Sequence, residues 1–181
     1  SVLAALGVGA DNRLNLPDTA RAVVVLIDGL GLVGLRQRAE AAPFLSSMAC
    51  VELTAGFPST TVTSLASLST GVPAGEHAMT GYSSYVEQVG GPVNWLSWRQ
   101  VSGKDDLREI LEPEDVQSHT TVWQQAADAG VAVTIASSRD FEGTGLTRAV
   151  FRGGGFRGVT TGGDMVALAA DAADRGHRSL V

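Results

Sequence analysis

Hydrophobic positions along the chain fall into short continuous runs and into segments with helical spacing. The clearest run covers residues 22–27, Ala-Val-Val-Val-Leu-Ile, whose β-branched side chains are typical of a strand buried on both faces of a sheet. Further strands are predicted over residues 51–54, 82–88, 131–136, 147–152 and 179–181. Apolar residues three or four positions apart predict helices over residues 30–38, 61–70, 105–111, 120–129 and 164–175.

The order of these elements predicts the fold class. Strands that alternate with helices favour an α/β fold with a mostly parallel sheet and helices on both faces. We interpret residues 1–181 as the N-terminal part of a single domain, with residues 1–20 as a lead-in segment and residues 74–117 as an irregular insertion or lid-like segment. The last predicted strand stops after residues 179–181, so we expect the domain to be truncated at the C-terminus, inside its sheet.

Composition and charge narrow the classes of partner. A chain of 181 residues with 44% hydrophobic and 18% charged residues is typical of a folded protein. A net charge of −6 argues against a nucleic-acid surface, which needs a basic stripe. The longest apolar run is far shorter than the ~20 residues of a membrane span. The chain starts at Ser1 without a leader pattern, which leaves the compartment open with a slight preference for the cytoplasm.

The single cysteine carries little chemistry. Cys50 rules out an internal disulfide and a cysteine-based zinc cluster. Because its neighbours Met48 and Val51 are apolar, we expect a buried structural thiol.

The first candidate functional residue is Asp28, which follows the predicted strand 22–27 and precedes Gly29. Ligands of open α/β sheets bind beyond the carboxyl ends of the strands, where Asp28 lies. A carboxylate in that position binds a cation or caps a helix. The strand and the Asp-Gly pair alone leave both roles open.

The second candidate lies in the hydroxyl-rich segment 57–64, Phe-Pro-Ser-Thr-Thr-Val-Thr-Ser, just before the helical pattern of residues 61–70. The start of a helix offers N–H groups and a partial positive charge, which stabilise phosphate and the alkoxide form of a hydroxyl. Thr61 is therefore a candidate nucleophile, once a divalent metal or a base activates it. The alternative for the same segment is an ordinary helix cap in a turn rich in Ser and Thr.

Three segments together resemble a known superfamily. They are residues 25–29 (Val-Leu-Ile-Asp-Gly), 57–61 (Phe-Pro-Ser-Thr-Thr) and 69–77 (Ser-Thr-Gly-Val-Pro-Ala-Gly-Glu-His). In this order they resemble the alkaline phosphatase superfamily, and within it the nucleotide pyrophosphatase/phosphodiesterase branch. Counting back from the Thr70-Gly71 pair places the nucleophilic threonine of that branch on Thr61. The specific motifs cover residues 21–82, and the rest of the chain is similar only in the order of its strands and helices.

The resemblance implies a two-metal hydrolase of phosphate esters, and in particular a phosphodiesterase or nucleotide pyrophosphatase. Asp28 would coordinate one of two divalent metal ions, with zinc as the expected metal. Thr61 would bind the same metal as an alkoxide, attack phosphorus and carry a covalent intermediate, which water activated by the second metal would release. The implied substrate is a small phosphorylated molecule, with a nucleotide as one candidate.

Some residues depart from the pattern of that branch. Ser64 stands where the branch has an asparagine that binds a phosphoryl oxygen, so Ser64 is only a weak candidate for substrate binding. Ala78 replaces the glycine that follows His77, and Pro73 is shifted. Phosphomonoesterase, sulfatase, phosphonate hydrolase and phosphomutase activities therefore stay open, although the Cys/Ser-x-Pro-x-Arg turn of sulfatases is absent at Thr61.

The remaining metal ligands of the superfamily have no counterpart in the chain. It has three histidines, and none forms the Asp-x-x-x-His or Asp-His pattern. His77 matches a histidine that supports a loop, and His119 and His177 look incidental. We expect the ligands of the second metal site beyond Val181. The alternative is a non-catalytic fragment or half-domain that needs a partner segment or chain to complete the site.

A glycine-rich segment, a group of aromatic residues and two basic residues are weaker candidates for a functional role. We interpret the glycine-rich segment 152–158 as a flexible hairpin or surface loop, since it lacks the spacing of a phosphate-binding loop. For the aromatic residues between 82 and 98, ordinary core or lid packing is favoured over a wall that stacks a nucleobase. Arg99 and Lys104 are interpreted as solvated loop charges.

Overall fold

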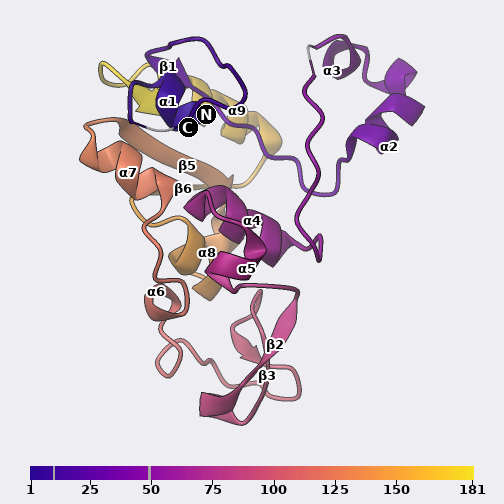
Figure 1. Cartoon of the computed structure of the whole chain (residues 1–181), viewed down its shortest axis with the longest axis vertical. Helices are drawn as coiled ribbons and strands as arrows, with labels where there is room; N and C mark the ends of the chain where they lie inside the picture. Colours follow the sequence, from indigo (N-terminus) through magenta and orange to yellow (C-terminus); the bar gives the residue numbers. More distant parts are fainter. Residues whose placement is uncertain (10, 49) are drawn as a thin grey trace. The chain divides into compact units, whose positions relative to one another are not determined.

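The computed structural model describes residues 1–9, 11–48 and 50–181 (Figure 1). The chain forms two compact units. The larger unit consists of residues 1–24 and 56–181, and the smaller unit consists of residues 25–55.

The larger unit contains a parallel sheet of four strands. These are β1 (Arg21–Ala22), β5 (Ala132–Ser138), β6 (Gly155–Val159) and β7 (Ser179–Leu180), in the order β1-β7-β5-β6. All three neighbouring pairs are parallel, with Arg21 opposite Ser179, Ala132 opposite Ser179 and Thr134 opposite Gly155. This sheet confirms the predicted α/β class and its mostly parallel pairing.

Helices flank the sheet and close its core. Helix α7 (Val122–Asp128) packs against β5, and α9 (Gly162–Ala173) packs against β5, β6 and β7. The short helix α1 (Val2–Ala5) contributes Leu3 to the same apolar cluster as Trp123 of α7 and Leu180 of β7. Burial of these large side chains stabilises the sheet by removing apolar area from water.

A second apolar cluster lies in the part of the larger unit that carries the hydroxyl-rich segment. It joins α4 (Thr61–Thr70) and α8 (Gly145–Val150) to an antiparallel sheet of β2 (Ser83–Val86), β3 (Gly91–Asn94) and β4 (Arg99–Gln100). Figure 1 shows α4, α8 and α5 (Ala74–His77) between the two sheets. The short helices η2 (Glu87–Val89), α6 (Pro113–Val116) and η3 (Arg139–Phe141) complete the unit.

The smaller unit holds α2 (Leu32–Gln37), η1 (Ala39–Ala41) and α3 (Pro43–Ser47). None of its described residues is buried. Arg36 and Glu52 form an ion pair between exposed side chains, an interaction that contributes little to stability in water. Cys50, predicted to be buried, is exposed in this unit, so that prediction is wrong.

Two predicted strands are wrong or shorter than expected. Of residues 22–27, only Ala22 lies in a strand; the Val24 N–H donates to the carbonyl of Val181, and Val25, Leu26 and Ile27 are exposed. A strand needs a hydrogen-bonded neighbour, and residues 25–27 belong to the smaller unit, whose described residues contain no strand to pair with them. Residues 51–54 are exposed and lie outside the strands of the described chain.

Three other segments also differ from the prediction. Residues 147–152 fall largely in α8 because Thr144 caps the Thr147 N–H and because buried apolar residues recur at helical spacing. Residues 105–111 form turns, since the Asp106 side chain accepts from the Arg108 N–H and competes with a helix.

The third segment is the glycine-rich stretch 152–158, which belongs largely to strand β6 rather than to a surface loop. A Cβ on Gly154 would lie 2.6 Å from the Ile135 side chain, and one on Gly158 would lie 2.9 Å from the Arg139 backbone. The glycines therefore allow close packing. In the described part of the chain, the helices are too short or too polar to cross a membrane.

Candidate active site

The start of helix α4 is the centre of the candidate site. Thr60 is the N-cap: its Oγ1 accepts from the Thr63 N–H at 3.4 Å, and its carbonyl accepts from the Ser64 N–H at 2.9 Å. Thr61 is the first residue of the helix and is half-buried. The sequence left open whether Thr61 itself serves as the cap, and the structure gives that role to Thr60.

Local sequence signals explain why α4 forms where it does. Thr60 satisfies an N–H group that the first turn of a helix leaves without an intrahelical partner. Val62 and Ala66, four positions apart, are both fully buried in the apolar cluster. Gly71 ends the helix in the left-handed region, at φ 74°, which a residue with a side chain rarely adopts. The predicted helix over residues 61–70 is therefore confirmed.

The segment that follows α5, residues 77–81, binds α4 at two levels. The His77 ring contacts Ser67 of α4, with 2.8 Å between Nε2 and Oγ. The Gly81 N–H donates to Thr63 Oγ1 at 2.9 Å, one turn from the helix start. Met79 lies between these contacts and is buried in the apolar cluster. We call residues 77–81 the support loop, because it binds α4 both in its first turn, at Thr63, and beyond its middle, at Ser67.

The hydrogen bonds of His77 define its protonation state. Its Nδ1 accepts from the Met79 N–H at 3.1 Å, so the proton of the neutral ring lies on Nε2 and points to Ser67 Oγ. Burial lowers the pKa of His77 below its ordinary value, because the charged ring loses hydration. The structure is consistent with the expected loop-supporting role of His77.

This state of His77 predicts a dependence of stability on pH. The pKa of His77 is lower in the folded protein than its value of 6.5 in the unfolded chain. The contribution of neutral His77 to stability is therefore complete above pH 6.5, and it is lost as the pH falls through the pKa of the folded protein. We expect the free energy of unfolding to fall on acidification from about pH 7.5 to about pH 5.5, with at most about 1.4 kcal/mol per pH unit from this residue. Urea unfolding across that range measures the slope.

The variant His77→Gln should flatten that dependence, and His177→Gln serves as the control because His177 is exposed. An equal slope in wild type and His77→Gln would show that His77 does not titrate with folding.

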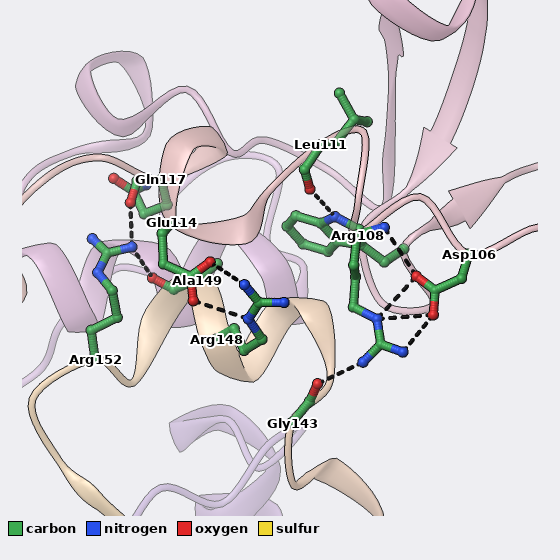
Figure 2. Close-up of polar contacts among 10 residues, drawn as sticks. Asp106, Arg108, Leu111, Glu114, Gln117, Gly143, Arg148, Ala149 and Arg152 are labelled. Carbon is green, nitrogen blue, oxygen red and sulfur yellow. Dashed lines mark hydrogen bonds and ion pairs between the residues drawn. The ribbon is translucent and has the colours of Figure 1, made fainter.

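A polar network extends from the support loop to helix α8. Gln117 is fully buried and donates from Nε2 to the His77 carbonyl at 3.2 Å. Arg152, just after α8, donates to the carbonyls of Gln117, His119 and Ala149, and Figure 2 shows its contacts with Gln117 and Ala149. Desolvation lowers the pKa of Arg152. The guanidinium of Arg152 thus ties the segment between α6 and α7 to the end of α8, and Gln117 of that segment binds the support loop.

Two ion pairs hold the neighbouring segments (Figure 2). Arg148 of α8 binds Glu114 of α6 in a bidentate pair, with Nε–Oε1 at 3.0 Å and Nη2–Oε2 at 2.6 Å, which lowers the pKa of Glu114. Arg108 binds Asp106, lowers the pKa of that carboxyl to about 2, and donates to the Gly143 carbonyl at 2.8 Å. These pairs involve partly exposed side chains, and we assign them to structure rather than to chemistry.

Asp28 lies in the smaller unit, in an exposed turn. The Leu30 N–H donates to the Ile27 carbonyl at 3.3 Å across this turn, and Gly29 adopts a φ of 76°. Helix α2 begins later and has Gly31 as its N-cap, so Asp28 does not cap it. Asp28 and Thr61 belong to different units, and their pairing at one metal stays a prediction.

The described residues do not by themselves complete a two-metal centre. Among them, no three or more side chains of His, Cys, Asp or Glu gather where a metal ion could bind. Asp28 and Thr61 would supply one carboxylate and one hydroxyl, whereas zinc usually takes four ligands.

The aromatic residues near the site divide into two groups. Trp95 and Trp98 are buried in the apolar cluster and pack edge to face, with ring centroids 5.1 Å apart. Tyr82 and Tyr85 are exposed. Core packing is thus confirmed for the two tryptophans.

Ser64, the weak candidate for substrate binding, is half-buried on α4, three residues after Thr61.

The other polar candidates are spread through the larger unit. His177, Arg99 and Lys104 are exposed, and His119 contacts Gln117, with 3.0 Å between Nδ1 and Oε1. The sequence analysis missed the roles of Thr63, Gln117 and Arg152. Only Thr63 had a local signal, because a hydroxyl three residues after the cap Thr60 can reach it.

A parallel α/β sheet with a hydroxyl-rich helix start, held by a partly buried support loop, is a framework suited to bind and attack phosphate esters. The family model of type I phosphodiesterase / nucleotide pyrophosphatase matches residues 22–149, and the chain belongs to this family of phosphate-ester hydrolases within the alkaline phosphatase superfamily. Neither the curated proteins nor the solved structures contain a match to the chain.

Proposed function

We propose that the chain supplies the nucleophile of a phosphodiesterase that acts on small phosphorylated molecules, including nucleotides, with Thr61 as the attacking residue. The observation that carries this proposal is that the threonines at the start of α4 have different structural roles. Thr60 caps the helix, Thr63 binds the support loop, and Thr61 stands between them as the first, half-buried residue of α4, at the positively polarised start of the helix. The family match covers this whole region.

In the proposed reaction the Thr61 oxygen attacks phosphorus. A new bond forms between Thr61 Oγ1 and phosphorus, the bond to the leaving alcohol breaks, and the proton lost by the Thr61 hydroxyl is balanced by the one that the leaving oxygen takes up. Water then attacks the phosphorylated threonine, releases the phosphate monoester and restores the hydroxyl. The partial positive charge at the start of α4 favours the negative charge that collects on the phosphoryl oxygens.

Ser64 is a secondary candidate in this proposal. It lies three residues after Thr61, so both side chains project from the same side of α4. Its hydroxyl is half-buried and is able to donate to a phosphoryl oxygen. Because serine is shorter than the asparagine of the related branch, we assign it a weaker contact than that asparagine makes.

We further propose two divalent metal ions, with zinc as the candidate, and Asp28 and Thr61 as ligands of one of them. Such an ion, when bound, would favour the alkoxide form of a hydroxyl nucleophile. The support for this part is the exposed turn that carries Asp28 and the fact that α2 is capped by Gly31 instead. For the second metal ion we propose no ligands among the residues of this chain.

Hydrolysis of bis-p-nitrophenyl phosphate tests the proposed class of reaction. We expect release of p-nitrophenol from the diester, and slower release from p-nitrophenyl phosphate at the same concentration. Faster turnover of the monoester would overturn the diesterase assignment. Absence of turnover of both, with zinc present, would favour the alternative of a half-domain that needs a partner segment.

Zinc titration tests the metal proposal separately. With only Asp28 and Thr61 assigned, we expect the chain to bind zinc with a dissociation constant no tighter than about 1 μM, because affinity grows with the number of ligands. Isothermal titration calorimetry measures the affinity, and Asp28→Asn should weaken it further. Two sites of sub-micromolar affinity would contradict this ligand assignment, as would unchanged binding in Asp28→Asn.

A further inference from the structure

We propose that Thr63 is a positioning residue, which holds the first turn of α4 against the support loop and thereby orients Thr61. This inference rests on the proposed role of Thr61 as nucleophile. Thr63 is placed two residues after Thr61, within the same helical turn, and its side chain is fully buried.

The hydroxyl of Thr63 connects the cap of the helix to the support loop. Its Oγ1 accepts from the Gly81 N–H at 2.9 Å and lies 3.0 Å from Thr60 Oγ1. Thr60 Oγ1 already accepts from the Thr63 N–H. We infer that the Thr63 hydroxyl donates a hydrogen bond to Thr60 Oγ1, so that the hydrogen bonds run in one direction from the Gly81 N–H through Thr63 to the cap.

The other end of this connection is held by further contacts. Gly81 has a φ of 74°, and a Cβ there would lie 3.8 Å from the Pro58 ring, so the loop also lies against the segment that precedes the cap. Further along the support loop, Met79 is buried and His77 is bound to Ser67. A shift of the first turn of α4 would therefore break contacts at several points.

The chemistry of position 63 favours this role over simple packing. Valine has nearly the same shape as threonine and would fill the same buried space without a polar atom. A buried hydroxyl is costly unless it is hydrogen-bonded, and here both of its bonds serve the turn that carries Thr61. Loss of that hydroxyl would leave the Gly81 N–H unsatisfied and the first turn less restrained.

The test compares three variants of the protein. Thr63→Val removes the hydroxyl, Thr63→Ser keeps it, and Thr70→Val is the matched control. Thr70 is also buried in α4, and its Oγ1 likewise donates, to the Ala66 carbonyl at 2.7 Å, and accepts, from the Val72 N–H at 3.4 Å. Thr70 lies in the last turn of the helix, away from Thr61.

For bis-p-nitrophenyl phosphate we expect Thr63→Val to lower kcat by about tenfold with KM within about twofold, because misplacement of a reacting group affects the chemical step most. Thr63→Ser should restore most of kcat, and Thr70→Val should leave it unchanged. Equal losses of kcat in Thr63→Val and Thr70→Val would overturn the positioning role, as would an unchanged kcat in Thr63→Val.

Amide hydrogen exchange keeps this inference separate from the proposed reaction. We expect Thr63→Val to speed exchange at Gly81 and at residues 61–63 by about tenfold or more, and Thr70→Val to leave those amides unchanged. If the wild type shows no Thr61-dependent turnover, the proposed function fails, and the exchange data alone decide whether Thr63 restrains the turn. Unchanged exchange in Thr63→Val would refute the restraint itself.

Discussion

Replacement of Thr61 by alanine is expected to lower kcat for bis-p-nitrophenyl phosphate by roughly a thousandfold or more, since the covalent route loses its nucleophile. Little loss of stability should accompany it. Thr61 is half-buried, and the cap of α4 is Thr60, so the helix start stays satisfied in the variant. Initial rates with zinc present, together with thermal unfolding of both proteins, measure the two effects.

Thr61→Ser is the control for this result, because it keeps a hydroxyl at the same place, primary instead of secondary, and should retain part of the activity. A covalent adduct should also be detectable on residue 61 by mass spectrometry after an acid quench of the wild type. Turnover that survives in Thr61→Ala, or an adduct on another residue, would remove Thr61 from the mechanism.

The helix that carries Thr61 could be predicted from the sequence because its signals are local. Val62 and Ala66 mark its buried face, the hydroxyls mark its start, and Gly71 marks its end. Each of these acts within one or two turns of the chain, so no tertiary contact is needed to read them. The same holds for α7, where Thr121 and Gln124 form a capping box.

The wrong predictions concern segments whose secondary structure depends on contacts with residues far away in the sequence. The apolar run 22–27 has the composition of a buried strand, yet strand pairing depends on β7, which lies more than 150 positions away in the sequence. In residues 147–152, the β-branched Thr147 and Val150 suggest a strand, but packing against α4 and α6 stabilises a helix. Local propensity is a weak guide where tertiary contacts decide.

In the candidate site, too, local features could be predicted and tertiary contacts could not. The order of the sequence motifs was enough to predict Thr61 as the candidate nucleophile. The restraint on Thr61 comes from Gly81 and His77, and the restraint on His77 comes from Gln117 and Arg152. These contacts join residues between ten and forty positions apart, and glutamine or arginine in a loop has no pattern that identifies a buried partner. Such contacts are seen only once the chain is folded.

Trp98 is the largest fully buried side chain in the apolar cluster around α4. It is only 1% exposed, and its Nε1–H donates to the Leu111 carbonyl at 2.7 Å. Its ring packs so closely on α8 that a Cβ added to Gly145 would overlap it. Trp98 also adopts a φ of 56°, an unfavourable conformation for a residue with a side chain, which the surrounding contacts must offset. The same cluster contains Val62 of α4, so its integrity bears on the position of Thr61.

Trp98→Ala is therefore expected to lower the free energy of unfolding by about 3–5 kcal/mol, through lost burial and the cavity that remains. Tyr85→Ala is the control, because Tyr85 lies on the neighbouring antiparallel sheet but is 70% exposed, and its loss should cost less than about 0.5 kcal/mol. Trp98→Phe should fall between the two, because it keeps most of the packing but leaves the Leu111 carbonyl without its donor. Urea unfolding of the four proteins measures these differences. If Trp98→Ala and Tyr85→Ala were equally stable, the apolar cluster around α4 would not hold this region together.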